Sequence, residues 1–339
     1  APVRQIQSIV STQAGVSLTP SGLHIRGARS YETGFLIDGV SARDPLAGTG
    51  FGIDIGSNAI EDVEITTSGA GADVGDATSG VIQTKTKSGG EKFELSGMYK
   101  RDDFGFNSSS PAVWNQQVME LGMGGPIKWV NKKRPTAFRY FVSGRAFYTD
   151  NFTRNPPKQV VSSLFPNTTF SPFLDNRYSG TMKLTYDFNE RQHLTFSFNK
   201  TIAINQDENM LRITGNDLPF IPGYQFLFSE QMDNANTYTH DGTLAILNWQ
   251  HSTNKRFAYN VTFSRFFARL RGDANGRDWR PNTVDSEFDP NSINTPPIQV
   301  FNPGDSIVFV NPPSGFYNNN GIATLWHHHY IEEYTLRFS

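Results

Sequence analysis

The sequence predicts a small α/β domain at the N-terminus, followed by antiparallel strands of a transmembrane β-barrel. Three observations lead to this fold class. Several segments alternate between apolar and polar residues, the connections between them are alternately short and long, and the chain is aromatic without being hydrophobic. Aromatic residues make up 13% of the 339 residues, although the mean hydropathy is only −0.45.

Charge and composition exclude several other classes. The formal net charge is −2, so the chain has no strong electrostatic footprint for nucleic acid. It contains no cysteine, which excludes disulfide scaffolds, cysteine-ligated metal centres and thiol nucleophiles. No run of about 18 apolar residues is present, so no membrane-spanning helix is expected. The start lacks a charged-then-apolar leader, so we expect that the chain is never exported or that its leader has been removed.

The texture of the sequence changes at residues 85–93, and we place the domain boundary there. Residues 1–90 are rich in Gly, Ala, Ser, Ile and Val. Residues 91–339 instead mix aromatic residues with polar ones. The joint itself, KTKSGGEKF, contains two glycines, as a linker between domains commonly does.

Strict alternation in the second domain indicates strands with one apolar and one polar face. Over residues 181–188, Thr, Lys, Thr and Asp occupy one face and Met, Leu, Tyr and Phe occupy the other. Residues 193–200, 259–264 and 330–338 follow the same rule. We therefore predict strands over residues 93–101, 117–127, 138–148, 177–188, 191–203, 242–251, 256–267 and 328–339.

The connections between these strands are sorted by length. Long connections cover residues 102–116, 149–176, 204–241 and 268–327, and short ones cover residues 128–137, 189–190 and 252–255. A soluble domain keeps most connections near about 4–6 residues, whereas an outer-membrane barrel has short turns at one end and long loops at the other. Because only every second residue of a barrel strand faces lipid, hydropathy stays low while aromatic residues accumulate at the interfaces.

Other all-β architectures fit the sequence less well than the barrel does. On alternation alone, a soluble β-sandwich or a carbohydrate-binding β-domain is the simplest alternative. The sorting of the loops disfavours both. A β-propeller would need a repeat of about 40–50 residues, and the sequence contains none.

Ordered motifs in the first 90 residues resemble the plug domain of TonB-dependent outer-membrane receptors. The matching segments are residues 23–27 (LHIRG), 35–40 (FLIDGV), 60–65 (IEDVEI) and 79–87 (SGVIQTKTK). After the boundary, residues 121–127 (LGMGGPI) resemble the end of the second barrel strand in that family. The small-residue turn at residues 69–75 and the TKSG that follows favour the Oar-like branch.

The resemblance implies a set of site residues. In the family, the arginine of the first motif helps to hold the plug in the barrel, often against wall carboxylates, so Arg26 is a predicted latch. A second family arginine is replaced here by Thr67. The motif positions expected to shape or hold the plug are Arg26, Gly27, Asp38, Gly39, Glu61, Glu64, Gly75, Gly80 and Lys87.

Local chemistry explains two of these motifs without the resemblance. Asp38 and Gly39 are suited to a tight turn after a strand, with Gly39 supplying positive φ. Ser57 and Asn58 are predicted to cap a helix start. The acids that follow, Glu61, Asp62 and Glu64, would then suit its first turn.

Metal and enzyme sites are not expected. In a strand His327 and His329 share one face and His328 takes the other, so the three cannot easily ligate one ion. Residues 273–278 (DANGRD) resemble a calcium loop only faintly, because Arg277 interrupts the pattern. No nucleophile elbow, zinc-protease motif or phosphate-binding loop occurs, so neither an enzyme nor a cofactor is expected.

The long loops are the candidate ligand surface. Aromatic side chains in them could stack on sugars or peptides, or could equally pack the loops onto each other. Both interpretations stay open. The candidate contact residues are Trp279, Phe288, Phe301, Phe316 and Tyr317.

The resemblance implies an active importer in the outer membrane of a Gram-negative, Bacteroidetes-like bacterium. A TonB-type energy-coupling protein, whose docking site is not in this chain, would pull on the plug. Membrane lipid or lipopolysaccharide and a surface lipoprotein are further expected partners, and nucleic acid is not. The cargo would be a peptide, a protein or a complex organic ligand. About eight of an expected 22 strands are present, so we expect a fragment.

Two functional alternatives remain. One is a SusC-type glycan importer with a surface lipoprotein lid, although residues 71–79 depart from the usual pattern of that branch. The other is a plugged barrel that serves as a surface binding or secretion-linked component without active uptake. An N-terminal segment that binds the coupling protein would favour transport.

Overall fold

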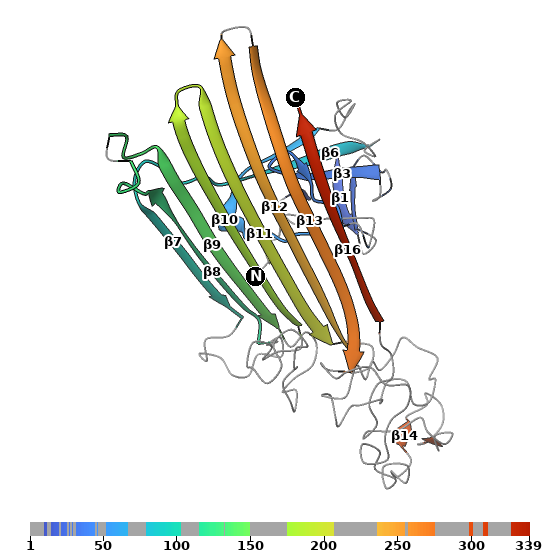
Figure 1. Ribbon diagram of the computed structural model, residues 1–339. Coiled ribbons are helices and arrows are strands. Elements are labelled where there is room, and N and C mark those ends of the chain that lie inside the picture. The colour runs from blue at the N-terminus through green and yellow to red at the C-terminus, as the bar shows by residue number, and fades with distance from the viewer. Residues whose placement is uncertain are drawn as a thin grey trace.

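An eight-stranded antiparallel sheet, here called the wall, dominates the computed structural model (Figure 1). The structure describes residues 10–11, 15–19, 22–25, 27, 29, 32–44, 46, 52–66, 79–102, 115–131, 133–149, 175–206, 236–254, 257–274, 298–300, 308–310 and 327–339. The wall strands are β7 (Glu94–Arg101), β8 (Gln117–Pro126), β9 (Phe138–Thr149), β10 (Asp175–Asn189), β11 (Gln192–Gln206), β12 (Asn236–Asn254), β13 (Phe257–Ala274) and β16 (His327–Phe338).

The wall confirms the fold class that the alternation predicts. Its strand order is β16-β13-β12-β11-β10-β9-β8-β7, and each neighbouring pair is antiparallel. The long connections all leave from one end of the wall, the lower end in Figure 1. The β10–β11 and β12–β13 hairpins turn at the opposite end. This sorting of connections is the arrangement expected of a barrel.

Two strands are longer than their sequence pattern indicates. β12 begins at Asn236 rather than near residue 242, and β13 continues to Ala274 rather than ending near residue 267. The ladder between them pairs Thr239 with Arg271 and Asp241 with Arg269. Polar residues occupy both faces at this end, so the hydrophobic pattern stops before the backbone pairing does.

The N-terminal sheet, here called the plug sheet, has four strands in the order β4-β3-β6-β5. Its strands are β3 (Thr33–Ile37), β4 (Val40–Ser41), β5 (Ile60–Thr66) and β6 (Gly80–Thr86). β3 and β6 are parallel, and the other two pairs are antiparallel. A separate hairpin joins β1 (Val16–Thr19) to β2 (Gly22–Ile25).

The predicted helix start at Ser57 is wrong in its detail. Residues Ser57–Ala59 form only a short 3-10 turn, η2, without a side-chain cap. Glu61 and Glu64 lie in β5 instead of a first helical turn. The Ser57 hydroxyl and the Asn58 backbone amide donate to a wall carboxylate, as described below, and the chain continues from the turn directly into β5.

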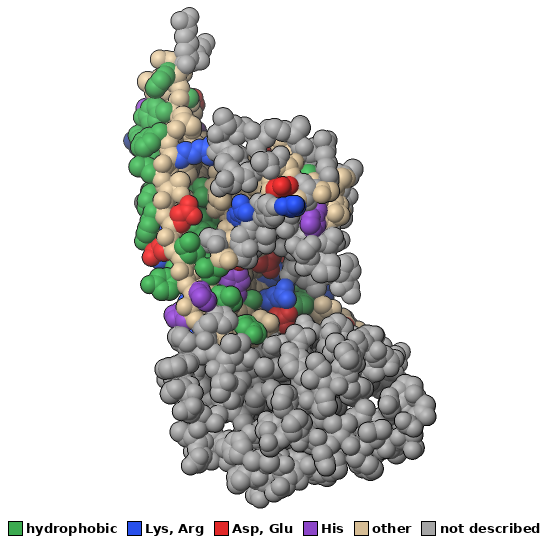
Figure 2. Space-filling model, turned by 90° about the vertical axis from the view of Figure 1, so that its right-hand side faces the viewer, with side chains coloured by type: hydrophobic (Ala, Val, Ile, Leu, Met, Phe, Trp, Pro, Cys, Tyr) green, Lys and Arg blue, Asp and Glu red, His purple; other side chains and the backbone are tan. Residues whose placement is uncertain are grey.

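The plug lies against one face of the wall, and the other face is apolar. In the edge-on view of Figure 2, hydrophobic side chains gather along the face turned away from the plug. On β16, for example, Tyr330, Tyr334, Leu336 and Phe338 are strongly exposed. This is the alternation expected when one face meets lipid and the other meets a filled lumen.

Plug and wall share one hydrophobic core. Phe35, Ile37 and Ile82 of the plug sheet are buried in the same cluster as Leu244 and Ile246 of β12. These two wall residues face inward, so β12 is apolar on both faces where the plug touches it. Contact with the plug, rather than with lipid, explains this local departure from alternation.

Two smaller findings complete the fold. A short hairpin, β14 (Ile298–Val300) with β15 (Val308–Val310), lies between β13 and β16 in the sequence. No helix among the residues described is both long and apolar enough to span a membrane.

Candidate functional site: the plug–wall interface

The Asp38–Gly39 turn brings a plug carboxylate to the wall. Asp38 (φ 48°) and Gly39 (φ 82°) both have positive φ between β3 and β4, as in a two-residue type I′ turn. The two residues therefore have the turn that the sequence predicts. A Cβ added to Gly39 would meet no atom within 4 Å, so glycine is needed there for its backbone conformation and not for space.

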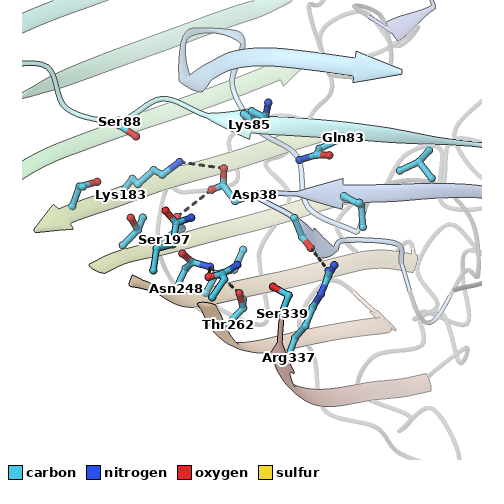
Figure 3. Close-up of a pocket in the computed structure, with 18 of the residues that line it drawn as sticks. Asp38, Gln83, Lys85, Ser88, Lys183, Ser197, Asn248, Thr262, Arg337 and Ser339 are labelled. Atoms are coloured by element: carbon cyan, nitrogen blue, oxygen red, sulfur yellow. Dashed lines mark hydrogen bonds and ion pairs between the residues drawn. The ribbon is translucent and has the colours of Figure 1, made fainter. Parts of the chain in front are cut away.

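The Asp38 carboxylate joins the plug sheet to two wall strands. Thr86 donates to it from the backbone (2.9 Å to Oδ1) and from the hydroxyl (2.6 Å to Oδ2). From the wall, Lys183 Nζ of β10 lies 3.2 Å from Oδ1 and Ser197 Oγ of β11 donates at 3.1 Å to Oδ2. Lys183 also donates to the Thr86 carbonyl at 2.9 Å. Figure 3 shows the Asp38 carboxylate between Lys183 and Ser197.

Asp54 makes a second polar contact between plug and wall. Each contact of a plug carboxylate with the wall is called a catch below. Its Oδ2 accepts a 2.6 Å hydrogen bond from Arg145 Nη1 of β9. Thr201 of β11 binds the Asp54 backbone twice, because its hydroxyl oxygen accepts from the amide (2.9 Å) and donates to the carbonyl (3.1 Å). Burial raises the pKa of the Asp54 carboxyl, and the nearby guanidinium groups of Arg145 and Arg177 oppose this rise.

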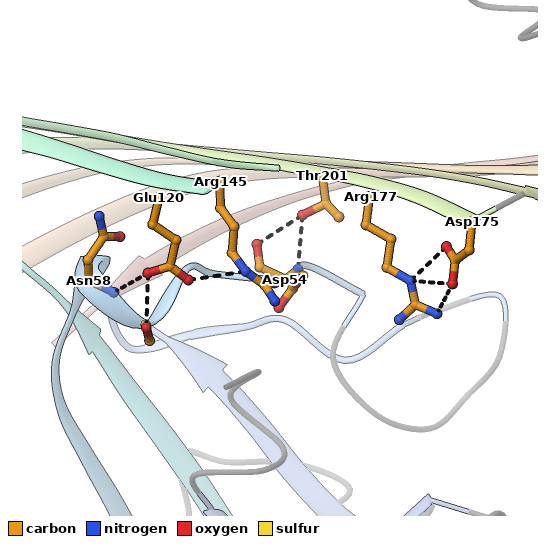
Figure 4. Close-up of polar contacts among 8 residues, drawn as sticks. Asp54, Asn58, Glu120, Arg145, Asp175, Arg177 and Thr201 are labelled. Carbon is orange, nitrogen blue, oxygen red and sulfur yellow. Dashed lines mark hydrogen bonds and ion pairs between the residues drawn. The ribbon is translucent and has the colours of Figure 1, made fainter. Parts of the chain in front are cut away.

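Glu120 of β8 accepts hydrogen bonds from the η2 turn and forms an ion pair with Arg145 (Figure 4). Its Oε2 accepts from the Ser57 hydroxyl at 3.0 Å and from the Asn58 backbone at 3.3 Å. Its Oε1 lies 3.1 Å from Arg145 Nε. Both wall side chains are only 2% exposed. The plug thus supplies two of the hydrogen bonds that the buried Glu120 carboxylate needs.

A third plug carboxylate faces β12. His240 Nε2 lies 3.4 Å from Asp44 Oδ2, which makes an ion pair when the imidazole is protonated. Asp44 is buried and also accepts from the Leu46 backbone at 2.9 Å. In the described residues, the plug thus supplies acids and the wall supplies bases at all three contacts.

Glycines allow the backbones of plug and wall to approach closely. A Cβ added to Gly242 of β12 would lie 2.5 Å from the carbonyl oxygen of Gly52, nearer than real Cβ atoms come. A Cβ on Gly89, just after the plug sheet, would overlap the backbone of Tyr140 on β9. At these two points the plug fits the wall by shape complementarity, whereas the acids bind the wall by charge.

A polar cavity of about 670 Å³ separates the plug sheet from the wall beside Asp38. Plug residues Gln83 and Lys85 line one side of it, and wall residues Lys183, Asn248 and Arg337 line the other. Arg337 Nη1 donates to the Gly39 carbonyl at 3.4 Å. Figure 3 shows Lys183, Asn248 and Arg337 on the side of the wall that faces the plug sheet.

The structure places some of the expected site residues and not others. Arg26 and Gly75 lie outside the described residues, as do the loop aromatics Trp279, Phe288, Phe301, Phe316 and Tyr317. Their roles therefore stay predictions. The structure brings Asp38 and Gly39 to the wall together.

The other described motif positions lie away from the Asp38 contact. Gly27 follows β2 with φ 75°. Gly80 opens β6, where it is buried. Lys87 binds the Ala59 carbonyl through its backbone at 2.8 Å. Glu61 and Glu64 are exposed on β5, and Glu64 lies 4.0 Å from Lys85.

The wall partners of these acids were not predicted from the sequence. Lys183 and Arg145 are single polar residues on the inner faces of alternating strands, like many others. One signal was available, because a long cation on the lumen face of a barrel strand requires a partner. The sequence alone does not say which carboxylate that partner is.

A small mixed sheet packed on one face of an antiparallel wall, whose other face is apolar, is the arrangement of a plug domain against part of a β-barrel. The comparisons with known proteins agree with that class. Residues 1–81 match the family model described as TonB-dependent Receptor Plug Domain. This match supports a relation between the N-terminal part of the chain and the TonB-dependent receptors.

One curated relative supports this assignment at the level of sequence. The chain is 27% identical over 231 residues to the TonB-dependent transporter Oar of Myxococcus xanthus. The match covers 58% of this chain and 21% of the relative. The chain therefore spans about a fifth of the length of that protein.

Solved receptors share the fold at low sequence identity. The alcaligin receptor FauA of Bordetella pertussis aligns with a TM-score of 0.53 at 12% identity, over 79% of this chain and 36% of that one. A variant of the ferric enterobactin receptor PfeA of Pseudomonas aeruginosa aligns with a TM-score of 0.54 at 16% identity, over 86% of this chain and 41% of that one. At this identity the likeness concerns the fold alone.

Proposed function

We propose that this chain provides the plug and part of the barrel of a TonB-dependent active importer. The observation that carries the proposal is the set of three plug carboxylates, Asp38, Asp44 and Asp54, each facing a wall base. A TonB-type energy-coupling protein would pull on the plug and break these contacts. The family match to the plug region and the Oar relative support this reading.

The polar contacts between plug and wall can be broken one at a time. Hydrogen bonds to charged groups contribute roughly 1.5–3 kcal/mol each. Polar contacts of this kind re-form after displacement, because water can satisfy both partners in the meantime. Segments that move in function are drawn from the less stable parts of a fold.

An energy-dependent movement of the plug tests this proposal. Ala59 is fully buried where η2 meets the wall, and the chain contains no cysteine. In the full-length receptor in cells, Ala59→Cys should react with a thiol reagent only when the coupling protein is present and energised. Ser252→Cys, exposed at the end of β12, is the control and should react in either case. Equal labelling of Ala59→Cys with and without the coupling protein would contradict active transport.

The cargo stays open between several classes. The sequence favours a peptide, a protein or a complex organic ligand, and the alternative of a SusC-type glycan importer with a lipoprotein lid is retained. The solved neighbours are named for alcaligin and enterobactin, which describes those proteins. A plugged barrel without active uptake is the remaining alternative, and the labelling experiment separates it from an importer.

We place the domain boundary between residues 90 and 91, in the segment between β6 and β7. The apolar outer face of the wall is proposed to contact membrane lipid, with lipopolysaccharide in the outer leaflet. We keep the source at the level of a Gram-negative bacterium, because the matched relative comes from Myxococcus xanthus and not from the Bacteroidetes.

A further inference from the structure

The cavity beside Asp38 is rich in cationic side chains. Its lining contains four of them and one carboxylate, which belongs to the plug. The four cations are Lys85, Arg139, Lys183 and Arg337. The rest of the lining is mainly neutral and polar, with amide and hydroxyl groups from β10, β11, β12 and β13.

Lys183 and Arg337 bind groups of the plug, since Arg337 donates to the Gly39 carbonyl, whereas Arg139 and Lys85 have partners within their own sheets. Arg139 is paired within the wall, 2.7 Å from Asp187, and Lys85 lies 4.0 Å from Glu64 within the plug. Lys183 instead binds the Asp38 carboxylate and the Thr86 carbonyl, both from the plug. It is only 11% exposed while the plug is docked, and displacement of the plug would remove both of these acceptors from its ammonium group.

The contact between Asp54 and Arg145 has the same arrangement, with the acid on the plug and the base on the wall. Arg145 is almost fully buried in the wall, and the plug carboxylate of Asp54 takes its Nη1. Its Nη2 has no hydrogen-bond partner among the described residues. At both places an acid of the plug occupies a position where the wall offers donors to an anion.

We propose that the cavity beside Asp38 binds an oxyanion group of the transported molecule, and that Asp38 occupies this anion site while the plug is docked. The inference rests on the proposed import function and narrows its cargo to molecules that carry carboxylate or phosphate-type groups. Lys183 and Ser197 would bind the oxyanion, because both already bind an oxygen of the Asp38 carboxylate. Arg139 and Arg337 supply further positive charge to the cavity.

The electrostatic potential of the cavity can be measured without knowing the cargo. A single cysteine at Thr195, a neutral lining residue on β11, is introduced into the full-length receptor. Its rates of reaction with an anionic and a cationic methanethiosulfonate of similar size are compared. The ratio of the two rates cancels differences in accessibility and in thiol pKa. The exposed Ser252→Cys variant gives the reference ratio.

We expect the anionic-to-cationic ratio at Thr195→Cys to exceed the reference by about fivefold, the effect of a surplus of one charge roughly 8 Å away in a watery medium. Adding Lys183→Gln should bring the ratio close to the reference. Adding Arg337→Gln instead should also lower the ratio. This second variant can be used if the Lys183→Gln variant does not fold. Lys133→Gln, in the exposed β8–β9 turn, is the matched control and should leave it unchanged.

Asp38→Asn removes the plug carboxylate from the proposed anion site, so this variant tests whether the site binds a free anion. In the Asp38→Asn, Thr195→Cys variant, millimolar inorganic pyrophosphate should slow labelling several-fold more than sodium chloride of equal ionic strength. With Asp38 present this protection should be much weaker. A ratio at Thr195→Cys at or below the reference, or no protection beyond that of the matched salt, would overturn the proposal. These measurements use purified receptor without a coupling protein, so their failure is distinguishable from a failure of active import.

Discussion

At the scale of single residues, Asp38 has two roles, because it forms a tight turn and also binds the wall through its carboxylate. It is one of the non-glycine residues with positive φ, a conformation that Asp tolerates better than most residues do. It also carries a carboxylate with four donors, two from Thr86 and one each from Lys183 and Ser197. The strained turn is held because its side chain is bound on both sides of the interface.

We predict that Asp38→Asn loosens the plug by about 1–3 kcal/mol, because the amide keeps the size of the side chain but loses the charge that Lys183 requires. Hydrogen exchange of the plug sheet in the full-length receptor measures the change. Glu64→Gln is the matched control, since Glu64 is exposed and its loose pair with Lys85 should contribute less than about 1 kcal/mol. Equal effects of the two changes would remove Asp38 from the set of catches.

A second prediction separates the two partners of Arg145. Arg145→Met should destabilise the plug–wall interface by about 3–5 kcal/mol, because it leaves Glu120 buried without a counter-charge. Asp54→Asn should cost less, since Arg145 keeps Glu120 at 3.1 Å. Denaturant unfolding of the plug in both variants provides the comparison. A larger effect of Asp54→Asn would show that the plug acid, rather than the wall pair, is the main support.

At the scale of elements, the close passage of β12 past the plug depends on the absence of side chains. Gly242 faces Gly52 with no room for a Cβ, and Leu244 and Ile246 pack next to it on the same face. The contact is therefore specified jointly by a missing side chain and two apolar ones. Neither feature belongs to the polar inner face that barrel alternation predicts.

We predict that Gly242→Ala displaces or loosens the plug, at a cost of about 1–3 kcal/mol, because the new methyl group meets backbone and not a flexible side chain. Gly144→Ala on β9 is the control, since a Cβ there meets nothing within 4 Å. Both changes place alanine in a wall strand, so strand propensity cancels. Limited proteolysis of the plug in each variant reports the difference, and similar patterns would argue against a tight seat.

At the scale of the whole molecule, the two faces of the wall have different environments. Leu247 and Trp249 of β12 are exposed on the outer face, whereas Leu244 and Ile246 are buried against the plug. Near the β12–β13 hairpin, Trp249 packs edge-on against Tyr259 with ring centroids 5.4 Å apart. An aromatic cluster beside short hairpins is typical of a membrane interface.

A lipid-facing charge should therefore be costly. We predict that Leu247→Arg lowers the stability of the folded barrel in lipid vesicles by about 2–4 kcal/mol if the position lies near the middle of the bilayer. Asn248→Arg is the comparison, because the neighbouring residue faces the polar lumen and the cavity, and it should cost less. Folding of the full-length receptor into vesicles measures both, and equal costs would contradict the assignment of the two faces.

The strands could be predicted from the sequence because alternation is a local property. All eight predicted wall strands are present, since each reports its own environment through neighbouring residues. The extra length of β12 and β13 was missed because the residues at those ends do not alternate between apolar and polar. The helix start at Ser57 was mistaken because a capping residue and a residue that binds a distant carboxylate look the same in sequence.

The catches could not be predicted, because their partners lie far apart along the chain. Asp38 meets Lys183 after 145 residues and Ser197 after 159, and Asp54 meets Arg145 after 91. The sequence by itself determined the barrel strands, the sorting of connections and the turn at Asp38, all of which depend on nearby residues. Only the tertiary structure decided which acids face which bases, because the docking of one sheet on another sets that pairing.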